Sequence, residues 1–435
     1  MPPIPNILWR FFPYHTVRRG WPVPWPGVAL LLVLLVGTAE LTAQRSDLKV
    51  LGRAKRIELP FTLENDFIVL SVVLNNVFPL RFIVDTGAEN TVLLEKEITD
   101  LLAVDYRRKF EVQGSDLSTV LTAYLATGIN LQLAGRLLAR NRSMLVLEEN
   151  YFDFERITGV EVQGILGADF LMRFTAEFDF RRRVLILHEP QKWKPSGRHR
   201  RVPADFVRNR AFLNLPVGVI SPEPTNRRVL LDSGAGLTLL LHQFPDSVGR
   251  HLDLPQRTVP TFIANGLGGN LRGNVGRASR VTLAERELTD VVTYFQPVDS
   301  TEINATNRRD GILGNRILRR FNVVVNYTGR EVWMAPERGR WRQRFRYDRS
   351  GLSVVAGGPK LKSFTVANVI PGSPGDEAGL RVGDRIVAVN GTSTGFMTLS
   401  GLITKLQGKV GRTIKLRYKR LGDYRTVKIR LRELI

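Results

Sequence analysis

The chain has 435 residues, no cysteine and five histidines, and its formal net charge at pH 7 is +22. This length indicates two to four domains, and a composition with 43% hydrophobic and 24% charged residues is typical of folded globular protein. The lack of cysteine excludes disulfide frameworks, cysteine nucleophiles, thiolate zinc sites and iron–sulfur clusters. The histidines show no metal-binding spacing, so we expect neither a metal nor a cofactor.

The N-terminal segment 1–43 combines positive charge with a short apolar run. Arg18 and Arg19 precede the apolar residues 28–36, and small and polar residues follow as far as Gln44. The run is too short to cross a bilayer comfortably, so the pattern predicts a secretory signal peptide, with an uncleaved membrane anchor as the alternative. We therefore expect an exported protein of the periplasm or cell envelope.

The positive charge of the chain favours acidic partner surfaces. Because the protein is expected to be exported, we expect no nucleic-acid partner, whereas contact with an anionic membrane surface is consistent with the charge. The densest basic stretch, residues 338–346, alternates arginine with Trp341 and Phe345, which suits a strand with one aromatic face. This stretch is either a solvated linker strand or a contact for a polyanion.

The chain contains an internal repeat. The sequence around Asp85 recurs around Asp232, and the sequence from Gly164 recurs from Gly311. Both offsets are 147 residues (232 − 85 and 311 − 164), so no insertion separates the two motifs differently in the two halves. One ancestral unit has therefore been used twice.

Each half of the repeat is predicted to be mainly β. Short apolar runs rich in β-branched and aromatic residues alternate with turn residues, and helical periodicity is almost absent. We place the two units at 56–190 and 203–338, separated by a basic, proline-containing linker. By analogy with isologous dimers, they are expected to face each other across a pseudo-twofold axis. The protein is then a monomer that forms an intramolecular pseudo-dimer.

The repeated motifs resemble those of the aspartic proteases. A single Asp-Thr/Ser-Gly is weak evidence, but here two such motifs each end an apolar strand and are each followed at the same distance by apolar-apolar-Gly. The matching residues are Asp85-Thr86-Gly87-Ala88, Ile165-Leu166-Gly167, Asp232-Ser233-Gly234-Ala235 and Ile312-Leu313-Gly314. The resemblance covers residues 57 to 337. It is strongest to retropepsin-like units, which are usually homodimers, here tethered in one chain as in pepsin.

The resemblance implies a catalytic dyad of Asp85 and Asp232. Two carboxylates that meet at an axis cannot both ionise cheaply, so they hold one proton between them. One can deprotonate a water while the other protonates the scissile amide. The family also implies residues that support the dyad: hydroxyls bonded across the axis, glycines in the tight turns, and glycines of a second loop behind each aspartate. These are Thr86, Ser233, Gly87, Gly234, Gly167 and Gly314.

Substrate contacts are implied for the residues after the dyad motifs and for a hairpin flap. The second unit (203–338, lobe 2) is richer in glycine at the flap position than the first unit (56–190, lobe 1). The two flaps are therefore expected to differ, with the lobe 2 flap the more mobile. Lobe 1 has Glu89 where retroviral enzymes carry an acid that holds substrate backbone, but lobe 2 has Gly236, so that contact is expected on one side. The substrate and flap residues are Ala88, Glu89, Ala235, Gly266, Gly268 and Gly269. Because Ala88 and Ala235 lack a hydroxyl donor, we predict activity at mildly acidic to near-neutral pH.

The C-terminal region 346–435 resembles a PDZ domain. The strongest signals are Ala378-Gly379-Leu380 and Gly383-Asp384. In that family a loop offers backbone amides to the terminal carboxylate of a peptide, which adds as a strand beside a helix. The loop residues are Gly351, Leu352, Ser353 and Val354, and the helix is predicted over 398–406. The domain either captures peptide C-termini or docks without binding a free C-terminus.

The sequence therefore predicts an exported aspartic endopeptidase whose PDZ domain recruits or gates a polypeptide substrate. The alternative, from another class, is a catalytically inactive peptide-binding scaffold of the cell envelope. A serine hydrolase is disfavoured because no Gly-x-Ser-x-Gly motif is present.

Overall fold

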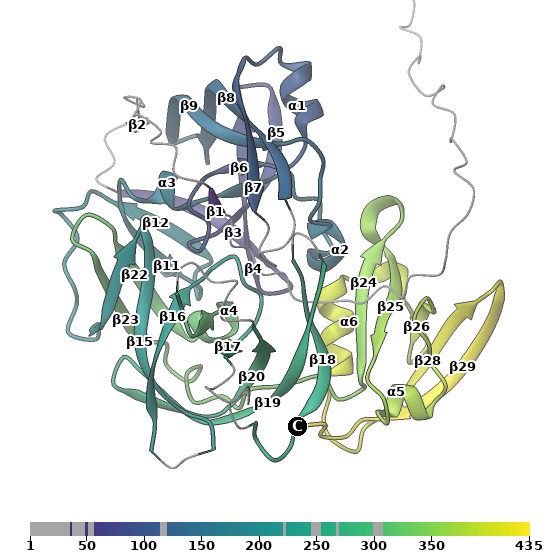
Figure 1. The fold of residues 1–435 in the computed structure, drawn as a ribbon. Coiled ribbons are helices and arrows are strands. Elements are labelled where there is room, and N and C mark those ends of the chain that lie inside the picture. Colours follow the sequence, from purple (N-terminus) through teal and green to yellow (C-terminus); the bar gives the residue numbers. More distant parts are fainter. Residues whose placement is uncertain are drawn as a thin grey trace, which may run out of the picture.

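The computed structural model describes residues 35–36, 48–50, 56–113, 120–220, 223–244, 254–266, 269–298 and 308–435. The predicted signal peptide or anchor, 1–43, lies outside these ranges apart from residues 35–36. Within the described ranges, no helix combines the length and apolar character needed to cross a bilayer. Two β-rich lobes lie one above the other, and a smaller C-terminal domain lies beside them (Figure 1).

The described residues of lobe 1 form strands and three short helices. Its strands form most of a fifteen-stranded sheet system. In β3 every second residue is buried, which gives the strand one core face. The strands are β1 (Leu35–Val36), β2 (Leu48–Val50), β3 (Arg56–Glu64), β4 (Phe67–Leu74), β5 (Phe78–Val84), β6 (Val92–Leu93), β7 (Tyr106–Gln113), β8 (Val120–Leu133), β9 (Leu137–Leu147), β10 (Gly164–Leu166), β11 (Thr175–Asp179) and β12 (Val184–His188). The helices are α1 (Lys96–Leu101), α2 (Phe154–Thr158) and α3 (Ala168–Leu171).

Lobe 2 repeats this plan, and its described residues include one short helix, α4 (Asn315–Leu318). Eight of its strands form a separate sheet. The strands are β13 (Arg200–Val202), β14 (Ala204–Val207), β15 (Arg210–Gly218), β16 (Thr225–Leu231), β17 (Leu239–Gln243), β18 (Val259–Gly266), β19 (Gly269–Leu283), β20 (Arg286–Pro297), β21 (Gly311–Leu313), β22 (Phe321–Asn326) and β23 (Glu331–Pro336).

The sequence repeat is a repeat of topology. In lobe 1, β10 pairs in parallel with β5 and antiparallel with β6. In lobe 2, β21 pairs in parallel with β16 and antiparallel with β17. The strand carrying each Asp motif is therefore held by the strand carrying the matching Ile-Leu-Gly motif. This confirms the predicted fold class, mainly β with two pseudo-symmetric lobes.

A shared sheet joins the lobes. β11 of lobe 1 pairs antiparallel with β22 of lobe 2, from Thr175 opposite Asn326 to Phe178 opposite Val323. The order β3-β12-β11-β22-β23-β13 makes this sheet continuous across the junction. Phe178 and Val323 are buried in a hydrophobic core that extends into both lobes. The two halves are therefore fixed relative to each other by backbone hydrogen bonds as well as by packing.

The C-terminal domain has a six-stranded sheet in the order β24-β25-β26-β28-β29, with β27 paired to β26. Helix α6 begins after Thr398, whose hydroxyl accepts the amide of Gly401 at 3.1 Å, so the predicted helix is present. The strands are β24 (Leu352–Gly357), β25 (Ser363–Val369), β26 (Arg385–Val389), β27 (Thr392–Ser393), β28 (Thr413–Arg420) and β29 (Asp423–Arg430). The helices are η3 (Pro359–Leu361), α5 (Pro374–Glu377), η4 (Thr394–Phe396) and α6 (Leu399–Leu406).

The basic stretch 338–346 does not form the predicted strand: it consists of turns and irregular backbone. Phe345 is buried in the core shared with lobe 2, and the Arg320 guanidinium lies 3.4 Å from the centroid of its ring. Arg320 also donates to the carbonyls of Trp341 and Gln343. The prediction was wrong because the Phe345 ring and two carbonyls of this stretch contact the buried Arg320 rather than a neighbouring strand.

The C-terminus is anchored on lobe 2. The Glu433 carboxylate lies 3.1 Å from the Arg277 guanidinium of β19 and 3.0 Å from that of Arg349. Ile435 is buried in the core that includes lobe 2 residues. The C-terminal domain is therefore tied to the lobes at its last residues as well as at its first strand.

Candidate active site

The two aspartates occupy equivalent positions at the ends of paired strands. Asp85 follows β5, and its amide donates to the carbonyl of Leu166 in β10 at 3.0 Å. Asp232 follows β16, and its amide donates to Leu313 in β21 at 3.1 Å. Both side chains are fully buried. Each apolar strand therefore delivers its carboxylate into the interior of the molecule.

Thr86 and Ser233 connect the two aspartate turns. The Thr86 amide donates to Ser233 Oγ, and the Ser233 amide donates to Thr86 Oγ1, both at 3.0 Å. The Thr86 hydroxyl donates to the Leu231 carbonyl at 2.7 Å, and the Ser233 hydroxyl donates to the Val84 carbonyl at 2.8 Å. All four hydrogen bonds cross between the lobes. They hold the two aspartate turns in a fixed, symmetric arrangement.

The glycine of each turn packs against the carboxylate of the opposite lobe. A Cβ placed on Gly87 would lie 2.8 Å from Cγ of Asp232, and one on Gly234 would lie 2.2 Å from Cγ of Asp85. Both distances are too short for a side chain. The structure therefore brings the two carboxylates together at the lobe junction, and only glycine fits beside them.

The backbone donors to the two carboxylates are unequal. Asp85 Oδ1 accepts the amides of Gly87 at 2.7 Å and Ala88 at 3.0 Å. Asp232 Oδ1 accepts only the amide of Gly234 among the hydrogen bonds of the described residues, at 2.8 Å, and the Ala235 amide donates to the Asp232 backbone carbonyl instead. Two donors favour the ionised form of Asp85 more than one donor favours that of Asp232.

Burial dominates the electrostatics of the pair. It raises the pKa of Asp85 to about 6, although the amides of Gly87 and Ala88 act in the opposite direction. Burial and the neighbouring charge of Asp85 raise the pKa of Asp232 well above its usual range. The arrangement favours one ionised and one protonated carboxyl at mildly acidic pH.

A second loop lies directly behind each aspartate turn. A Cβ on Gly167 would lie 2.5 Å from the carbonyl oxygen of Asn90, and one on Gly314 would lie 2.4 Å from that of Leu237. In both lobes the residue after this glycine donates its amide to the alanine of the aspartate motif: Ala168 to Ala88 at 2.8 Å and Asn315 to Ala235 at 2.9 Å. The close approach requires glycine at both positions.

Glu89, for which a substrate contact is predicted, pairs with a residue of lobe 2. Its Oε1 lies 2.7 Å from the guanidinium of Arg210, which is fully buried at the start of β15. On the opposite side of the pseudo-twofold axis, Gly236 contacts the Phe67 ring, since a Cβ there would lie 2.8 Å from it. Equivalent positions on the two sides of the axis are therefore occupied differently. One side holds the ion pair of Glu89 and Arg210, and the other holds the Phe67 ring packed on Gly236.

Both lobes carry the hairpin at the predicted flap position. In lobe 1 it is β7–β8, which pairs as far as Gln113 opposite Val120. In lobe 2 it is β18–β19, where Gly266 pairs with Gly269. Gly268, between these two glycines in the sequence, lies outside the described residues.

The predicted peptide loop of the C-terminal domain faces lobe 2. Leu352, Ser353 and Val354 line a cavity of about 60 Å³ together with α6 and the β18 residues Thr261 and Phe262. Helix α6 also contacts lobe 1, since Ser400 Oγ accepts the amide of Asn65 at 3.0 Å. The groove of this domain is therefore closed by the lobes to a volume that holds one or two waters.

Gly351 bonds an internal carboxylate. Its amide donates to Asp348, which also accepts the amide of Ser350 at 3.0 Å and the Ser350 hydroxyl at 2.8 Å. Burial raises the pKa of Asp348 to about 6. An acidic side chain of this chain thus bonds the amides at the start of the peptide loop.

Sequence reasoning missed Arg210 and Asp348. Arg210 opens a strand in a basic chain and has no motif around it, so only the fold brings it to Glu89. Asp348 stands three residues before Gly351, and its position beside a loop of backbone donors was the one available signal.

Residues 70–170 match the aspartyl protease family, and residues 365–420 match the PDZ domain family. The first match includes Asp85, whereas Asp232 lies in the repeat beyond it. The chain thus joins an aspartyl protease domain to a C-terminal PDZ domain, in agreement with the predicted resemblance.

A curated protein of Lactococcus lactis subsp. lactis, named as a zinc metalloprotease, is 35% identical over 78 residues, which are 18% of this chain and 18% of that protein. This chain therefore spans less than a fifth of that relative. Within the described residues, no three His, Cys, Asp or Glu side chains are grouped as ligands for a metal ion.

Solved structures with similarity include the aspartic proteinase from Irpex lacteus, at 15% identity, covering 65% of this chain and 98% of that one with a TM-score of 0.40. Basic 7S globulin from soybean has 9% identity, with coverage of 65% and 95% and a TM-score of 0.39. The photosystem II D1 C-terminal processing protease has 27% identity over 20% of this chain and 24% of that one, with a TM-score of 0.19.

Proposed function

We propose that this chain, which combines an aspartyl protease domain with a PDZ domain, is an exported aspartic endopeptidase that hydrolyses peptide bonds with a water molecule activated by Asp85 and Asp232. The observation that carries the proposal is the meeting of these two buried carboxylates, each in contact with the glycine of the opposite turn. Burying two acids together is costly, and a fold that does so twice by the same motif has a chemical use for them.

In this mechanism Asp85 is the base and Asp232 the acid. Asp85 accepts two backbone amides and Asp232 one, so the ionised form is better stabilised at Asp85. Asp85 takes a proton from water as the oxygen attacks the scissile carbonyl carbon, and Asp232 gives its proton to the carbonyl oxygen. Collapse of the resulting tetrahedral diol breaks the C–N bond: a diol hydroxyl returns its proton to Asp232 as the carbonyl re-forms, and the proton on Asp85 passes to the leaving nitrogen. Both carboxyls then regain their starting protonation states.

The substrate in this proposal is a polypeptide held under the hairpins β7–β8 and β18–β19. The base of β18 also touches the C-terminal domain, because Thr261 and Phe262 line the cavity beside Leu352. A movement of the PDZ domain would therefore change the packing of the lobe 2 hairpin β18–β19 at Thr261 and Phe262. We propose that this domain gates access of substrate rather than presenting an open groove.

Binding of a labelled peptide to the full chain tests the gating role. A peptide with a free C-terminal carboxylate and its amidated counterpart are compared, with Asp348→Asn as the variant that weakens the internal carboxylate contact. Gating predicts weak binding by the parent and tighter binding of the free-carboxylate peptide by Asp348→Asn. Tight, carboxylate-dependent binding by the parent would instead favour recruitment through an open groove.

The peptidase itself is tested with Asp85→Asn and Asp232→Asn on unfolded and native envelope proteins. Each variant is expected to lose peptide hydrolysis while it remains folded, because asparagine keeps the Oδ1 acceptor for the turn amides. A statine-type mimic of the tetrahedral state should inhibit the parent. Absence of proteolysis in the parent, unchanged in both variants, would favour an inactive peptide-binding scaffold.

Export and a periplasmic or envelope location are part of the proposal and rest on residues 1–43. Sequencing the N-terminus of the mature protein tests them. A start after residue 39 or 43 supports a cleaved signal peptide, and an intact Met1 in the membrane fraction supports an anchor.

A further inference from the structure

The hairpin β28–β29 lies on the side of the C-terminal domain that is farthest from the two lobes (Figure 1). In β28 buried and exposed residues alternate. Ile414, Leu416 and Tyr418 are buried in the domain core. The residues between them, Lys415 and Arg417, are exposed on the outer face.

The outer face of this hairpin is cationic on both strands. Lys415 lies directly opposite Lys428, and Arg430 continues the face beyond it opposite Thr413. Like charges directly opposite on a sheet are destabilising. Five cations share this face: Lys415, Arg417, Lys419, Lys428 and Arg430. None of the five takes part in an ion pair among the described residues.

The hairpin has little acid of its own. Between residues 413 and 430 the sequence contains seven lysines and arginines and one acid, Asp423. That carboxylate lies 3.7 Å from the Arg425 guanidinium. The acidic residue of the hairpin therefore does not neutralise the cations of the outer face, and these cations can bind an anionic partner.

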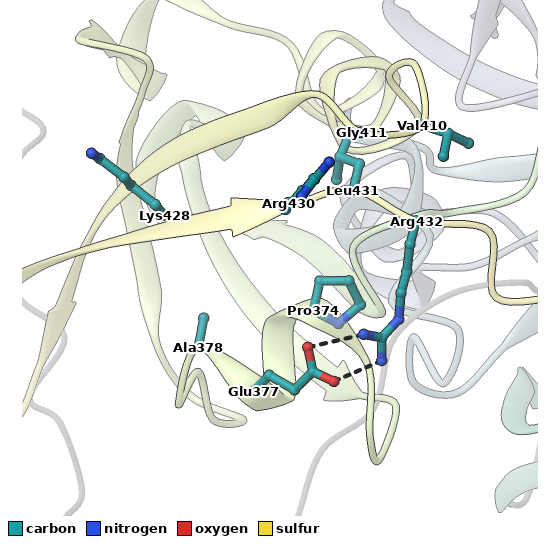
Figure 2. Close-up of a pocket in the computed structure, with 9 residues that line it drawn as sticks. All are labelled: Pro374, Glu377, Ala378, Val410, Gly411, Lys428, Arg430, Leu431 and Arg432. Carbon is teal, nitrogen blue, oxygen red and sulfur yellow. Dashed lines mark hydrogen bonds and ion pairs between the residues drawn. The ribbon is translucent and has the colours of Figure 1, made fainter.

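A groove of about 520 Å³ continues the cationic face towards α5. Figure 2 shows Arg432 turned to Glu377, with the two side chains joined by hydrogen bonds of 2.7 and 3.0 Å. Lys428 extends away from this pair. Glu377 therefore neutralises Arg432 and leaves Lys428 and Arg430 to act on a ligand.

The tip of the hairpin carries two exposed residues with apolar surface beside the exposed carboxylate of Asp423. Leu421 is 100% exposed and Tyr424 is 57% exposed. The Arg417 guanidinium lies 4.7 Å from the centroid of the Tyr424 ring, and the Lys419 ammonium lies 5.6 Å from it. Leu421 thus projects beyond the row of cations, and the amphipathic Tyr424 ring lies at the end of the row, directly opposite Lys419.

We propose that the β28–β29 hairpin docks the protein on a bilayer that contains anionic phospholipid. The cations of the outer face would lie along the headgroups, and Leu421 and Tyr424 would enter the interfacial region. A soluble polyanion such as nucleic acid would neutralise the cations but would leave the Leu421 side chain in water. The exposed Leu421 therefore favours a membrane over a soluble polyanion as the partner. The inference does not depend on peptidase activity.

Co-sedimentation of the full chain with vesicles tests this surface. The vesicles are neutral phosphatidylcholine alone or phosphatidylcholine mixed with phosphatidylglycerol, at low and high salt. The triple variant Lys415→Gln, Arg417→Gln, Lys428→Gln removes three charges from the face. The matched control removes three exposed cations of lobe 1 that have no ion pair among the described residues: Arg136→Gln, Arg140→Gln and Arg181→Gln. The apolar N-terminal run is common to all of these proteins, so differences between them report on the substituted surface.

The parent is expected to bind the anionic vesicles more tightly than the neutral ones, with an affinity that falls as salt rises. At about fivefold per charge near the surface, the hairpin triple variant should lose on the order of a hundredfold in affinity, and the control much less. The single variant Leu421→Gln should weaken the binding that persists at high salt.

Equal losses in the two triple variants would overturn the proposal, because net charge alone would then explain binding. The same conclusion would follow if Leu421→Gln had no effect and duplex DNA bound the hairpin as tightly as the vesicles do. Intact circular dichroism of the hairpin variants keeps a loss of folding apart from a loss of binding.

Discussion

Thr86 and Ser233 exchange hydrogen bonds across the lobe junction, each offering its amide to the hydroxyl of the other at 3.0 Å. Each hydroxyl is also a donor, to the carbonyl that precedes the aspartate of the opposite lobe. The residues are 147 positions apart and occupy the same place in the repeat. These hydrogen bonds therefore hold the Asp85 and Asp232 turns in a fixed arrangement.

Removing the Thr86 hydroxyl should loosen this junction. Thr86→Ala leaves the buried Ser233 amide without its acceptor and the Leu231 carbonyl without its donor, so we expect a loss of about 2 to 4 kcal/mol in the free energy of unfolding, with loss of activity. Thr86→Ser keeps the hydroxyl and should stay within about 1 kcal/mol of the parent. Urea denaturation of both variants measures the difference. Equal free energies of unfolding would show that the Thr86 hydroxyl hydrogen bonds contribute nothing to stability.

Gly234 should not tolerate a methyl group. In Gly234→Ala the new Cβ would lie 2.2 Å from Cγ of Asp85, so the carboxylate must move, with a cost of about 1 to 3 kcal/mol and near-complete loss of peptide hydrolysis. Gly197→Ala is the control, because its Cβ would meet nothing within 4 Å. Thermal melts and peptide cleavage assays on both variants check this. An active Gly234→Ala would mean that Asp85 need not stay at this position.

The buried Asp85 should make the protein less stable as the pH rises. Its pKa in the folded state, about 6, lies above the ordinary aspartate pKa of 3.8, so the folded state binds the proton more tightly. The contribution to stability is present at low pH and is lost as the pH rises between these two values. Asp85→Asn removes this term and should exceed the parent by about 3 kcal/mol at neutral pH, but not at pH 3.8 or below.

Denaturant titrations of parent and Asp85→Asn across this pH range measure the difference directly, because contributions from other groups largely cancel. A difference that does not change with pH would contradict the raised pKa. The same pKa predicts that peptide hydrolysis falls as Asp85 becomes protonated below about pH 6, and an activity profile confined below about pH 3.5 would contradict it.

The Glu89–Arg210 pair should be replaceable by its counterpart across the pseudo-twofold axis. Arg210→Phe alone removes the guanidinium at 2.7 Å from the largely buried Glu89 and leaves only that of Arg208 at 3.7 Å, so it should cost up to about 3 to 5 kcal/mol. The double variant Glu89→Gly, Arg210→Phe copies the Gly236 and Phe67 contact and should recover most of this loss. Chemical denaturation of the single and double variants gives the coupling energy. No recovery in the double variant would show that the two sides are not equivalent in shape.

Much of the site could be predicted from the sequence because the repeat preserves spacing. Asp85 and Gly164 are the same number of residues from their counterparts in the second half. The strand that ends at each aspartate is therefore expected to pair in the same way with the strand that begins at the matching glycine. The roles of Glu89 and Arg210 could not be predicted in this way, since 121 residues and a lobe boundary separate them. The strand predicted over 338–346 is absent for a related reason. Arg320 lies outside this stretch, but it contacts the Phe345 ring and bonds the carbonyls of Trp341 and Gln343. The local sequence does not reveal these contacts.

The sequence by itself determined the mainly β fold, the two lobes and the pair of aspartates, because periodicity, turn residues and a repeated spacing are local properties of the chain. Tertiary structure alone decided which carboxylate receives more backbone donors, that Glu89 pairs with Arg210, and that the PDZ groove is closed against the lobe 2 hairpin. These features depend on burial and on contacts between distant segments. Such contacts arise only when the lobes and the C-terminal domain pack together and exclude water.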